Sequence, residues 1–338
     1  MKAIFDDRQR LHDPQHFMAN GKTYPSPESP ERIARLMAGA QAAGCAFQPP
    51  QDAGLGPIAA IHSAEYLHFL RTIYPRWQRI PDAGPEVIPN IHPAARTDNY
   101  PKSAIGQAGY HQADTACPIG PQTSDAAYWS AQSAITGADL IAEGQRAVYV
   151  LSRPPGHHAF SDLAGGFCFL NNSAIAAARL RAHGLRPAIL DVDVHHGNGT
   201  QGIFYDRDDV LTVSLHADPD RFYPFFWGAA QERGTGRGMG CNLNLPLPRG
   251  TDDAGYLRAL DTALARIHAF GADAVVVALG LDAHIDDPFK GLAITTPGFQ
   301  AIARAIAGTG LPLVLVQEGG YVSDALADNL TAFLRGVS

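Results

Sequence analysis

Five short runs that are mostly apolar and rich in β-branched residues alternate along the chain with segments of helical periodicity. The runs are AVYVL (147–151), AILDVDV (188–194), VLTVSL (210–215), AVVVAL (274–279) and LVLV (313–316). Continuous apolar runs of this length are typical of strands that are buried on both faces, as in a parallel sheet. The chain is therefore predicted to form an α/β fold around such a sheet.

The segments between these runs carry signals for the start and the end of helices. Residues 124–144 begin with a serine suited to capping a helix and end with glycine, and residues 171–184 and 252–271 follow the same pattern. Strands that alternate with helices imply crossover connections, which place helices on both faces of the sheet. No linker or internal repeat divides the chain, so we expect one domain over residues 1–338.

Two regions lack a clear period. Residues 74–101 are rich in proline, and residues 216–250 combine an aromatic cluster with a glycine cluster. Both regions are predicted to be irregular, and residues 74–101 are predicted to form a long surface loop. Loops of this length are uncommon in compact domains and are often functional.

Composition restricts the class of protein. The 26 Lys and Arg residues are outnumbered by 33 Asp and Glu residues, whereas a protein that tracks nucleic-acid phosphates normally shows the opposite balance. The four cysteines form no CxxC pair, which argues against a disulfide framework and a cysteine-based zinc site. No run of about 18 apolar residues is present, so we expect no membrane-spanning helix. The first ten residues, MKAIFDDRQR, are charged and contain no apolar stretch of the length that a secretory signal needs. They favour a cytoplasmic protein over a secreted one.

Polar side chains directly follow four of the five predicted strands. In chain order, the motifs at these four strand ends are SRPPGHH, DVDVHHGNG, GLDAH and QEGGY. Because the carboxyl ends of parallel strands meet at one edge of a sheet, where ligands bind, Asp, His and Tyr side chains should converge there.

Three of these residues form a candidate metal site. Asp193 and His195 are two residues apart, so they share one face if the strand extends that far, and Asp282 arrives from another strand. This set of two carboxylates and one imidazole suits a divalent ion such as zinc and leaves one position open for water, as catalytic sites do. Each residue alone is more often a helix cap or a packed polar group, so the argument depends on their convergence.

The neighbouring motifs supply groups for acid–base chemistry. Metal-assisted hydrolysis needs one group to accept a proton from water and to return it to the departing amine. The tandem histidines His157 and His158 suit this role near neutral pH. Tyr321 is placed to donate a hydrogen bond to a developing oxyanion.

In its motifs the chain resembles the zinc-dependent histone deacetylase superfamily, and specifically its bacterial acetylpolyamine amidohydrolases. The motifs occur in family order within residues 147–321: RPPGHHA, GGFCFLNN, ILDVDVHHGNGTQ, VSLH, LGLDAH and QEGGY. The similarity extends more weakly to HSAEYLHFL near the start of the chain. The resemblance implies an arginase/deacetylase-like fold and a zinc-dependent amidohydrolase that acts on small cationic acetylated amines, with lysine deacetylation of peptides or proteins as the alternative.

The resemblance also implies roles for individual residues. A divalent ion is expected on Asp193, His195 and Asp282: zinc, or Fe²⁺ or another divalent ion in the cell. His158 would be the main general base and acid, with His157 as its electrostatic partner, and Tyr321 would polarise the scissile carbonyl. Further site residues are Asp191, which would orient His157, Asn198, which would orient His158, and Gly166, Phe167 and Tyr223, which would bind the substrate.

Two structural potassium ions and a homodimer are implied as well. The first potassium site matches Asp191, Asp193, His195, Ser214 and Leu215, and the second matches Phe204, Arg207, Val210 and Asn242. The loop 74–101 resembles an insertion that helps to form a dimer and narrows the site. Where that insertion carries a carboxylate for the distant amine of the substrate, this chain has Thr97, followed by Asp98.

Two other functions compete with this interpretation. The segment LDAHIDD contains a D-A-H-x-D pattern, which in an arginase-like ureohydrolase would place Asp282, His284 and Asp286 in a two-metal site. Such an enzyme needs neither the tandem histidines nor the tyrosine of QEGGY. The second alternative is a catalytically silent binder of acylated amines, against which stands the presence of every expected catalytic residue.

Overall fold

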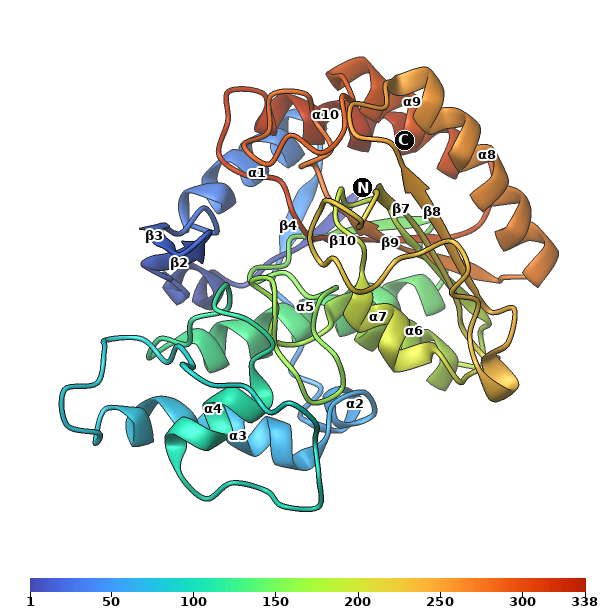
Figure 1. Ribbon diagram of the computed structural model, residues 1–338. Helices are drawn as coiled ribbons and strands as arrows, with labels where there is room; N and C mark the ends of the chain where they lie inside the picture. Colours follow the sequence, from blue (N-terminus) through green and yellow to red (C-terminus); the bar gives the residue numbers. More distant parts are fainter.

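An eight-stranded parallel sheet forms the centre of the protein in a computed structural model that describes all 338 residues (Figure 1). From one edge to the other, its strands are β4 (Ala46–Gln48), β1 (Lys2–Ile4), β5 (Ala147–Val150), β10 (Leu313–Gln317), β9 (Ala274–Leu279), β6 (Pro187–Asp191), β7 (Leu211–Ala217) and β8 (Asn242–Leu247). Two further strands, β2 (His16–Ala19) and β3 (Lys22–Pro25), form a separate antiparallel hairpin.

Helices cover both faces of the sheet (Figure 1). One face carries α1 (Glu31–Ala42), α8 (Asp253–Phe270), α9 (Thr296–Ala307) and α10 (Leu326–Val337). On the opposite side lie α2 (Gly56–Ala59), α3 (Ala64–Trp77), α4 (Ala104–His111), α5 (Thr123–Ala142), α6 (Asn172–Ala182) and α7 (Asn198–Phe204). Two short 3₁₀ helices span Asp7–Leu11 and Gly236–Gly238.

Each central strand contributes side chains to two separate hydrophobic cores. In β10, Leu313 and Leu315 pack toward α8–α10, while Val314 and Val316 pack into the core with α3, α5 and α6. Because successive side chains of a strand point to opposite faces, a strand between two helical layers must be apolar at every position. This requirement explains the continuous apolar runs, and the predicted α/β fold is confirmed.

Several local predictions were wrong. The region 216–250 contains β8, and residues 74–77 extend α3 instead of starting the loop. Ser124 does not cap α5, which begins one residue earlier after Gln122 without a side-chain cap. By contrast, α8 has the expected ends: the Asp252 side chain accepts a hydrogen bond from the Gly255 N–H, and Gly271 follows in the left-handed conformation that favours glycine.

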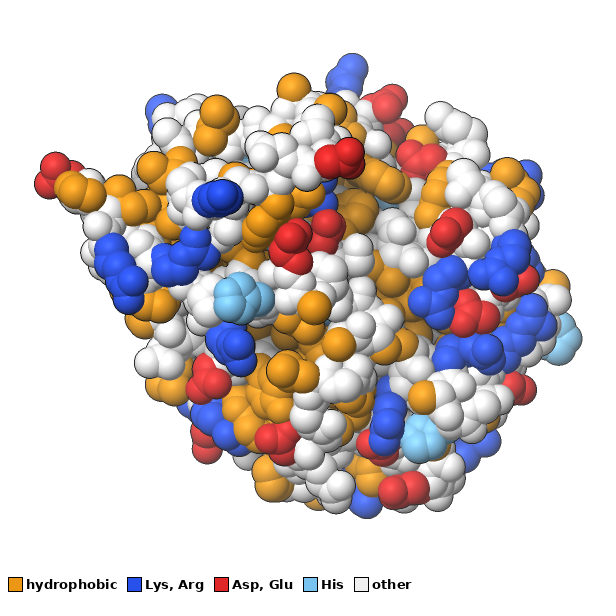
Figure 2. All heavy atoms as spheres, turned by 90° about the horizontal axis from the view of Figure 1, so that it is seen from below, with side chains coloured by type: hydrophobic (Ala, Val, Ile, Leu, Met, Phe, Trp, Pro, Cys, Tyr) orange, Lys and Arg blue, Asp and Glu red, His pale blue; other side chains and the backbone are white.

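The segment between α3 and α4 has no regular secondary structure apart from an isolated bridge of Val87 with Ile119. It is held to the body by Tyr100, whose hydroxyl lies 2.9 Å from His111 Nε2, and by an ion pair of Arg96 with Asp162. The face formed by α2, α3 and α4 intersperses acidic, basic and hydrophobic side chains (Figure 2). No helix is both long and apolar enough to cross a bilayer.

Candidate active site

The candidate site residues come from four adjacent strands. The strands β5, β10, β9 and β6 are consecutive neighbours in the sheet, and the loops after their carboxyl ends carry the motifs identified in the sequence. Sequence positions as far apart as Asp193 and Tyr321 therefore lie around one site. Their convergence follows from the strand order, which no single motif encodes.

Asp193, His195 and Asp282 offer three ligand atoms that lie within 4.8 Å of one another. His195 Nδ1 is 3.1 Å from Asp193 Oδ1 and 3.2 Å from Asp282 Oδ2. The Asp282 Oδ2 atom is buried and, apart from this contact with His195, has no hydrogen-bond partner. Burial and repulsion from Asp193 raise the pKa of Asp282. Two buried carboxylates in contact are stabilised by a cation between them, so the donor set fits a divalent ion.

The backbone reaches this arrangement differently from the expectation of an extended strand. The strand β6 ends at Asp191, and Asp193 and His195 lie in the turn that follows. Asp193 Oδ1 accepts a hydrogen bond of 2.9 Å from the His195 N–H, and Asp193 Oδ2 accepts one of 2.7 Å from the Gly319 N–H. A side-chain turn of this kind, and not a shared strand face, directs the two residues toward Asp282.

The tandem histidines differ in charge because they have different partners. His157 Nδ1 donates to Asp191 Oδ2 at 2.9 Å, and His158 Nδ1 donates to Asn198 Oδ1 at 2.7 Å. Burial opposes a charge on His157, but the carboxylates of Asp191 and Asp193 outweigh it and raise its pKa to about 10. Burial and the charge on His157 lower the pKa of His158 well below its usual value. His158 is therefore neutral, and its Nε2 is free to accept a proton.

Tyr321 and His158 line one cavity of about 230 Å³, together with His195. The Tyr321 ring packs between Phe167 and Phe289, at centroid distances of 5.8 and 4.8 Å. Burial raises the pKa of Tyr321 well above its usual value, so its phenol stays protonated and remains a hydrogen-bond donor. The cavity thus brings together a base, a donor and a possible cation site.

The walls of this cavity include the predicted substrate-binding residues Gly166, Phe167 and Tyr223. Gly166 has a φ of 50°, and a Cβ atom there would overlap the ring of His158. Glycine is therefore required for the close approach of this loop to the catalytic histidine. Four further wall residues, Phe17, Phe222, Phe225 and Phe289, were not predicted to line the site, although Phe222 and Phe225 belong to the aromatic cluster noted within residues 216–250.

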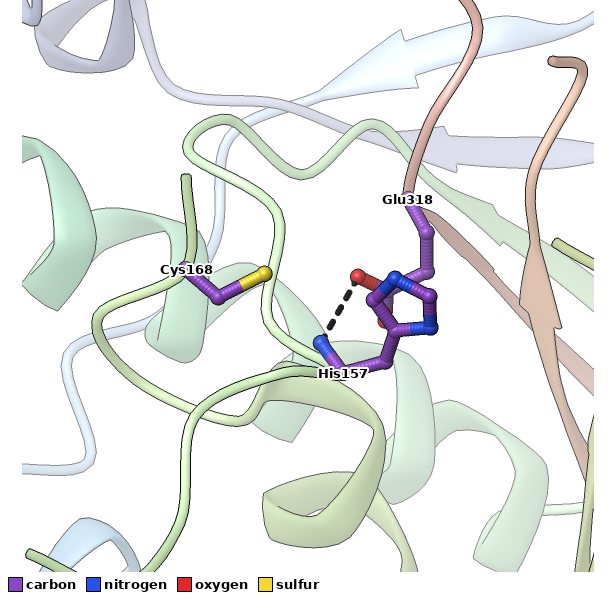
Figure 3. A group of neighbouring side chains, drawn as sticks. All are labelled: His157, Cys168 and Glu318. Carbon is purple, nitrogen blue, oxygen red and sulfur yellow. Dashed lines mark hydrogen bonds between the residues drawn. The ribbon is translucent and has the colours of Figure 1, made fainter. Parts of the chain in front are cut away.

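Glu318 was not identified from the sequence, although it lies within the QEGGY motif. Its carboxylate is fully buried and accepts a hydrogen bond from the N–H group of His157 (Figure 3). It also accepts hydrogen bonds from the N–H group of Gly156 and from the hydroxyl of Ser173. Burial raises its pKa to about 7. Glu318, His157 and Cys168 also lie close enough to suggest a second metal site. However, both carboxylate oxygens and the His157 ring are already hydrogen-bonded, so we interpret Glu318 as a support for the histidine loop.

The residues of the two predicted potassium sites lie around β6, β7 and β8. In the first set, Asp191 and Ser214 are paired across β6 and β7. In the second set, Phe204 ends α7, and the Arg207 N–H donates to the Phe204 carbonyl at 3.0 Å. Asn242 begins β8 and donates through its amide to Gln201 and Glu232.

The structure does not assemble the two-metal site of the arginase-like alternative. His284 Nδ1 accepts a hydrogen bond from the Asp286 N–H, and its ring stacks on Phe299. The Asp286 side chain is 76% exposed. Neither residue joins Asp282 in a group of converging ligands.

Comparisons with known proteins agree with this geometry. The model of the histone deacetylase domain matches residues 26–337. The acetylpolyamine amidohydrolase of Burkholderia pseudomallei is 47% identical over 99% of this chain and 98% of its own length, and that of Mycoplana ramosa is 42% identical over the whole of both chains. A crystal structure of the acetylpolyamine aminohydrolase from Burkholderia pseudomallei superposes with a TM-score of 0.97 at 46% identity, covering 100% of this chain and 98% of that one.

Proposed function

Because the chain belongs to the histone deacetylase family and is a deacetylase, we propose that it hydrolyses the acetyl amides of small acetylated amines, with acetylpolyamines as the first candidates. The observation that carries this proposal is the convergence of Asp193, His195 and Asp282 with His158 and Tyr321 at one narrow, largely apolar cavity. Such a cavity suits a slender acylated chain. The names of the relatives support the acetylpolyamine class.

Family membership implies a divalent metal, and we propose zinc on Asp193, His195 and Asp282. When bound, such an ion would polarise the amide carbonyl and acidify the attacking water. The neutral His158 would accept the proton of that water at Nε2 and pass it to the departing amine. Asn198 would keep the His158 ring in the required tautomer. The charged His157, held by Asp191, would stabilise the negative charge that develops beside it.

The remaining roles concern the substrate. The Tyr321 hydroxyl would donate a hydrogen bond to the carbonyl oxygen as it gains charge. Phe167 and Tyr223, together with Gly166, would enclose the methylene chain of the acylated amine. We also propose that potassium ions bind at the two sets of ligands around β6–β8. The protein would form a homodimer and lie in the cytoplasm. The four free cysteines agree with a reducing compartment.

A turnover panel tests the proposed activity. The panel contains acetylputrescine, acetylspermidine, acetylcadaverine and acetyl-lysine peptides, each with and without a chelator. We expect deacetylation of the small amines, loss of activity with the chelator and recovery on adding Zn²⁺. A preference for long acetyl-lysine peptides over every small amine would identify a lysine deacetylase instead. No turnover of any acylated amine would contradict the proposed function.

The proposed dimer is tested at Ile91, which is 61% exposed in the segment between α3 and α4. If this segment contributes to a dimer contact, Ile91→Asp should shift the protein toward monomer, because a charge would replace buried apolar surface. Met239→Asp is the matched control, since Met239 is 63% exposed elsewhere. Size-exclusion chromatography with light scattering measures the result. An unchanged oligomeric state in the Ile91 variant would exclude this surface as the contact.

A further inference from the structure

The charged side chains around the cavity are distributed unevenly. No Asp or Glu contributes to the lining, and Arg221 is the one Lys or Arg that does. We propose that Arg221 is a specificity-determining residue, which disfavours acylated amines with a cationic far end relative to those with a neutral or anionic far end. This inference rests on the proposed function and concerns the contribution of one residue to the choice among small acylated amines.

The acidic groups behind the cavity walls are already engaged by donors. Asp114 accepts hydrogen bonds from the Tyr223 hydroxyl at 2.7 Å and from the N–H groups of Gly166 and Ala116 at 3.1 and 2.8 Å. Asp287, behind Tyr321 and Phe289, accepts from the N–H groups of both residues. These contacts use the carboxylates to position the walls. A substrate ammonium in the cavity would therefore meet no carboxylate among the lining residues.

Glu86, which contacts the β2–β3 hairpin, is likewise engaged by hydrogen-bond donors. It is 6% exposed and accepts hydrogen bonds from the Gln15 N–H and from His16. The hairpin in turn supplies Phe17 to the cavity wall. The carboxylate is thus buried in a contact between two segments of the chain and does not face the substrate.

Arg221, by contrast, has no partner for its side chain. Its backbone N–H donates to the Asp218 carbonyl, but its guanidinium makes no hydrogen bond or ion pair, and the residue is exposed. Arg221 lines both the cavity and a neighbouring hollow of about 350 Å³, whereas Asp218, Asp220 and Arg249 line the neighbouring hollow alone. An unpaired arginine among the lining residues of the cavity can attract a carboxylate and repel an ammonium at the far end of a substrate.

The aromatic walls exert an opposing effect. Phenylalanine faces attract cations, with an energy similar to that of an exposed ion pair. The overall preference of the enzyme therefore combines two effects of similar size. The contribution of Arg221 is measured by how the preference changes when this residue alone is replaced.

The test uses three substrates of matched length: N-acetyl-1,5-diaminopentane with a cationic end, 6-acetamidohexanoate with an anionic end and N-hexylacetamide with a neutral end. The kcat/KM of each is measured for the parent holoenzyme and for Arg221→Ala and Arg221→Glu. We expect Arg221→Ala to lower the anion-to-cation ratio by about two- to fivefold, the range for an exposed ion pair, and Arg221→Glu to lower it further. The change should lie mainly in KM, since the reacting amide is at the other end, and should shrink in high salt.

Arg249→Ala is the matched control, because Arg249 carries the same charge beside the neighbouring hollow but does not line the cavity. We expect this variant to leave the ratio unchanged. An equal change in the Arg249 variant, or an unchanged ratio in both Arg221 variants, would overturn the assignment. Activity on the neutral substrate verifies the proposed function independently. Failure to hydrolyse any of the three would instead count against the deacetylation of small amines.

Discussion

Replacement of Tyr321 by phenylalanine is expected to lower kcat by about 100- to 1,000-fold, which is the usual cost of losing one oxyanion donor and corresponds to about 2.7–4 kcal/mol. The reason is that burial keeps the phenol of Tyr321 protonated at the cavity, where it can donate a hydrogen bond to the substrate carbonyl. Phenylalanine preserves the packing against Phe167 and Phe289. Steady-state kinetics on the best acetylated amine measure the effect.

The same variant should keep its metal content and its thermal midpoint, because only one hydroxyl is removed. Tyr128→Phe is the control: it deletes a phenol that binds Asp52 on the surface and does not line the cavity. We expect this variant to retain the kcat of the parent. If Tyr321→Phe turned over substrate within a few-fold of the parent rate, Tyr321 would be a packing residue and the oxyanion donor would lie elsewhere.

The central strands could be predicted from the sequence because a strand buried between two helical layers is apolar at successive positions, which is a local sequence pattern. The strands that escaped prediction lack that pattern. The strands β1 and β4 have three residues each, too few to show a period. The strand β8 reads NLNLPL, alternates between polar and apolar residues and contains proline, as is tolerated at the edge of a sheet.

The predicted zinc ligands, the tandem histidines and Tyr321 share a local signal too, since each stands in a short motif near the end of a predicted strand. The residues that hold these site residues in place have no such signal. Glu318 holds Gly156 across 162 positions of the chain, and Asp114 holds Tyr223 across 109. Their partners are backbone N–H groups and two hydroxyls, those of Ser173 and Tyr223, which impose no recognisable residue pattern. Such contacts depend on which loops meet after folding, and that information lies in the tertiary structure. The direction of Asp193 and His195 was missed because β6 ends at Asp191, three residues before the predicted end of the strand at residue 194.

Asp282→Ala is expected to abolish most of the activity together with metal retention. Loss of a hydrogen-bond partner of a ligand already costs roughly 10- to 100-fold in metal affinity, so loss of a ligand should cost more. In the parent protein, Zn²⁺ should raise the thermal midpoint, because a ligand that binds only the folded state stabilises that state. We expect this increase to disappear in the variant. Elemental analysis after dialysis and thermal melts with and without Zn²⁺ measure both effects independently of turnover.

Asp286→Ala provides the matched control, since Asp286 belongs to the same LDAHIDD segment but is exposed and does not converge with the other ligands. Three results together would support a mononuclear deacetylase site. The parent would hold one metal ion per chain, the Asp286 variant would keep full activity, and the Asp282 variant would lose both its metal and its activity. Loss of metal from both variants, or two ions per parent chain, would favour the two-metal alternative. Retention of the zinc-dependent increase in thermal midpoint by Asp282→Ala would remove Asp282 from the ligand set. The buried Oδ2 atom of Asp282, which has no hydrogen-bond partner apart from its contact with His195, would then need another explanation.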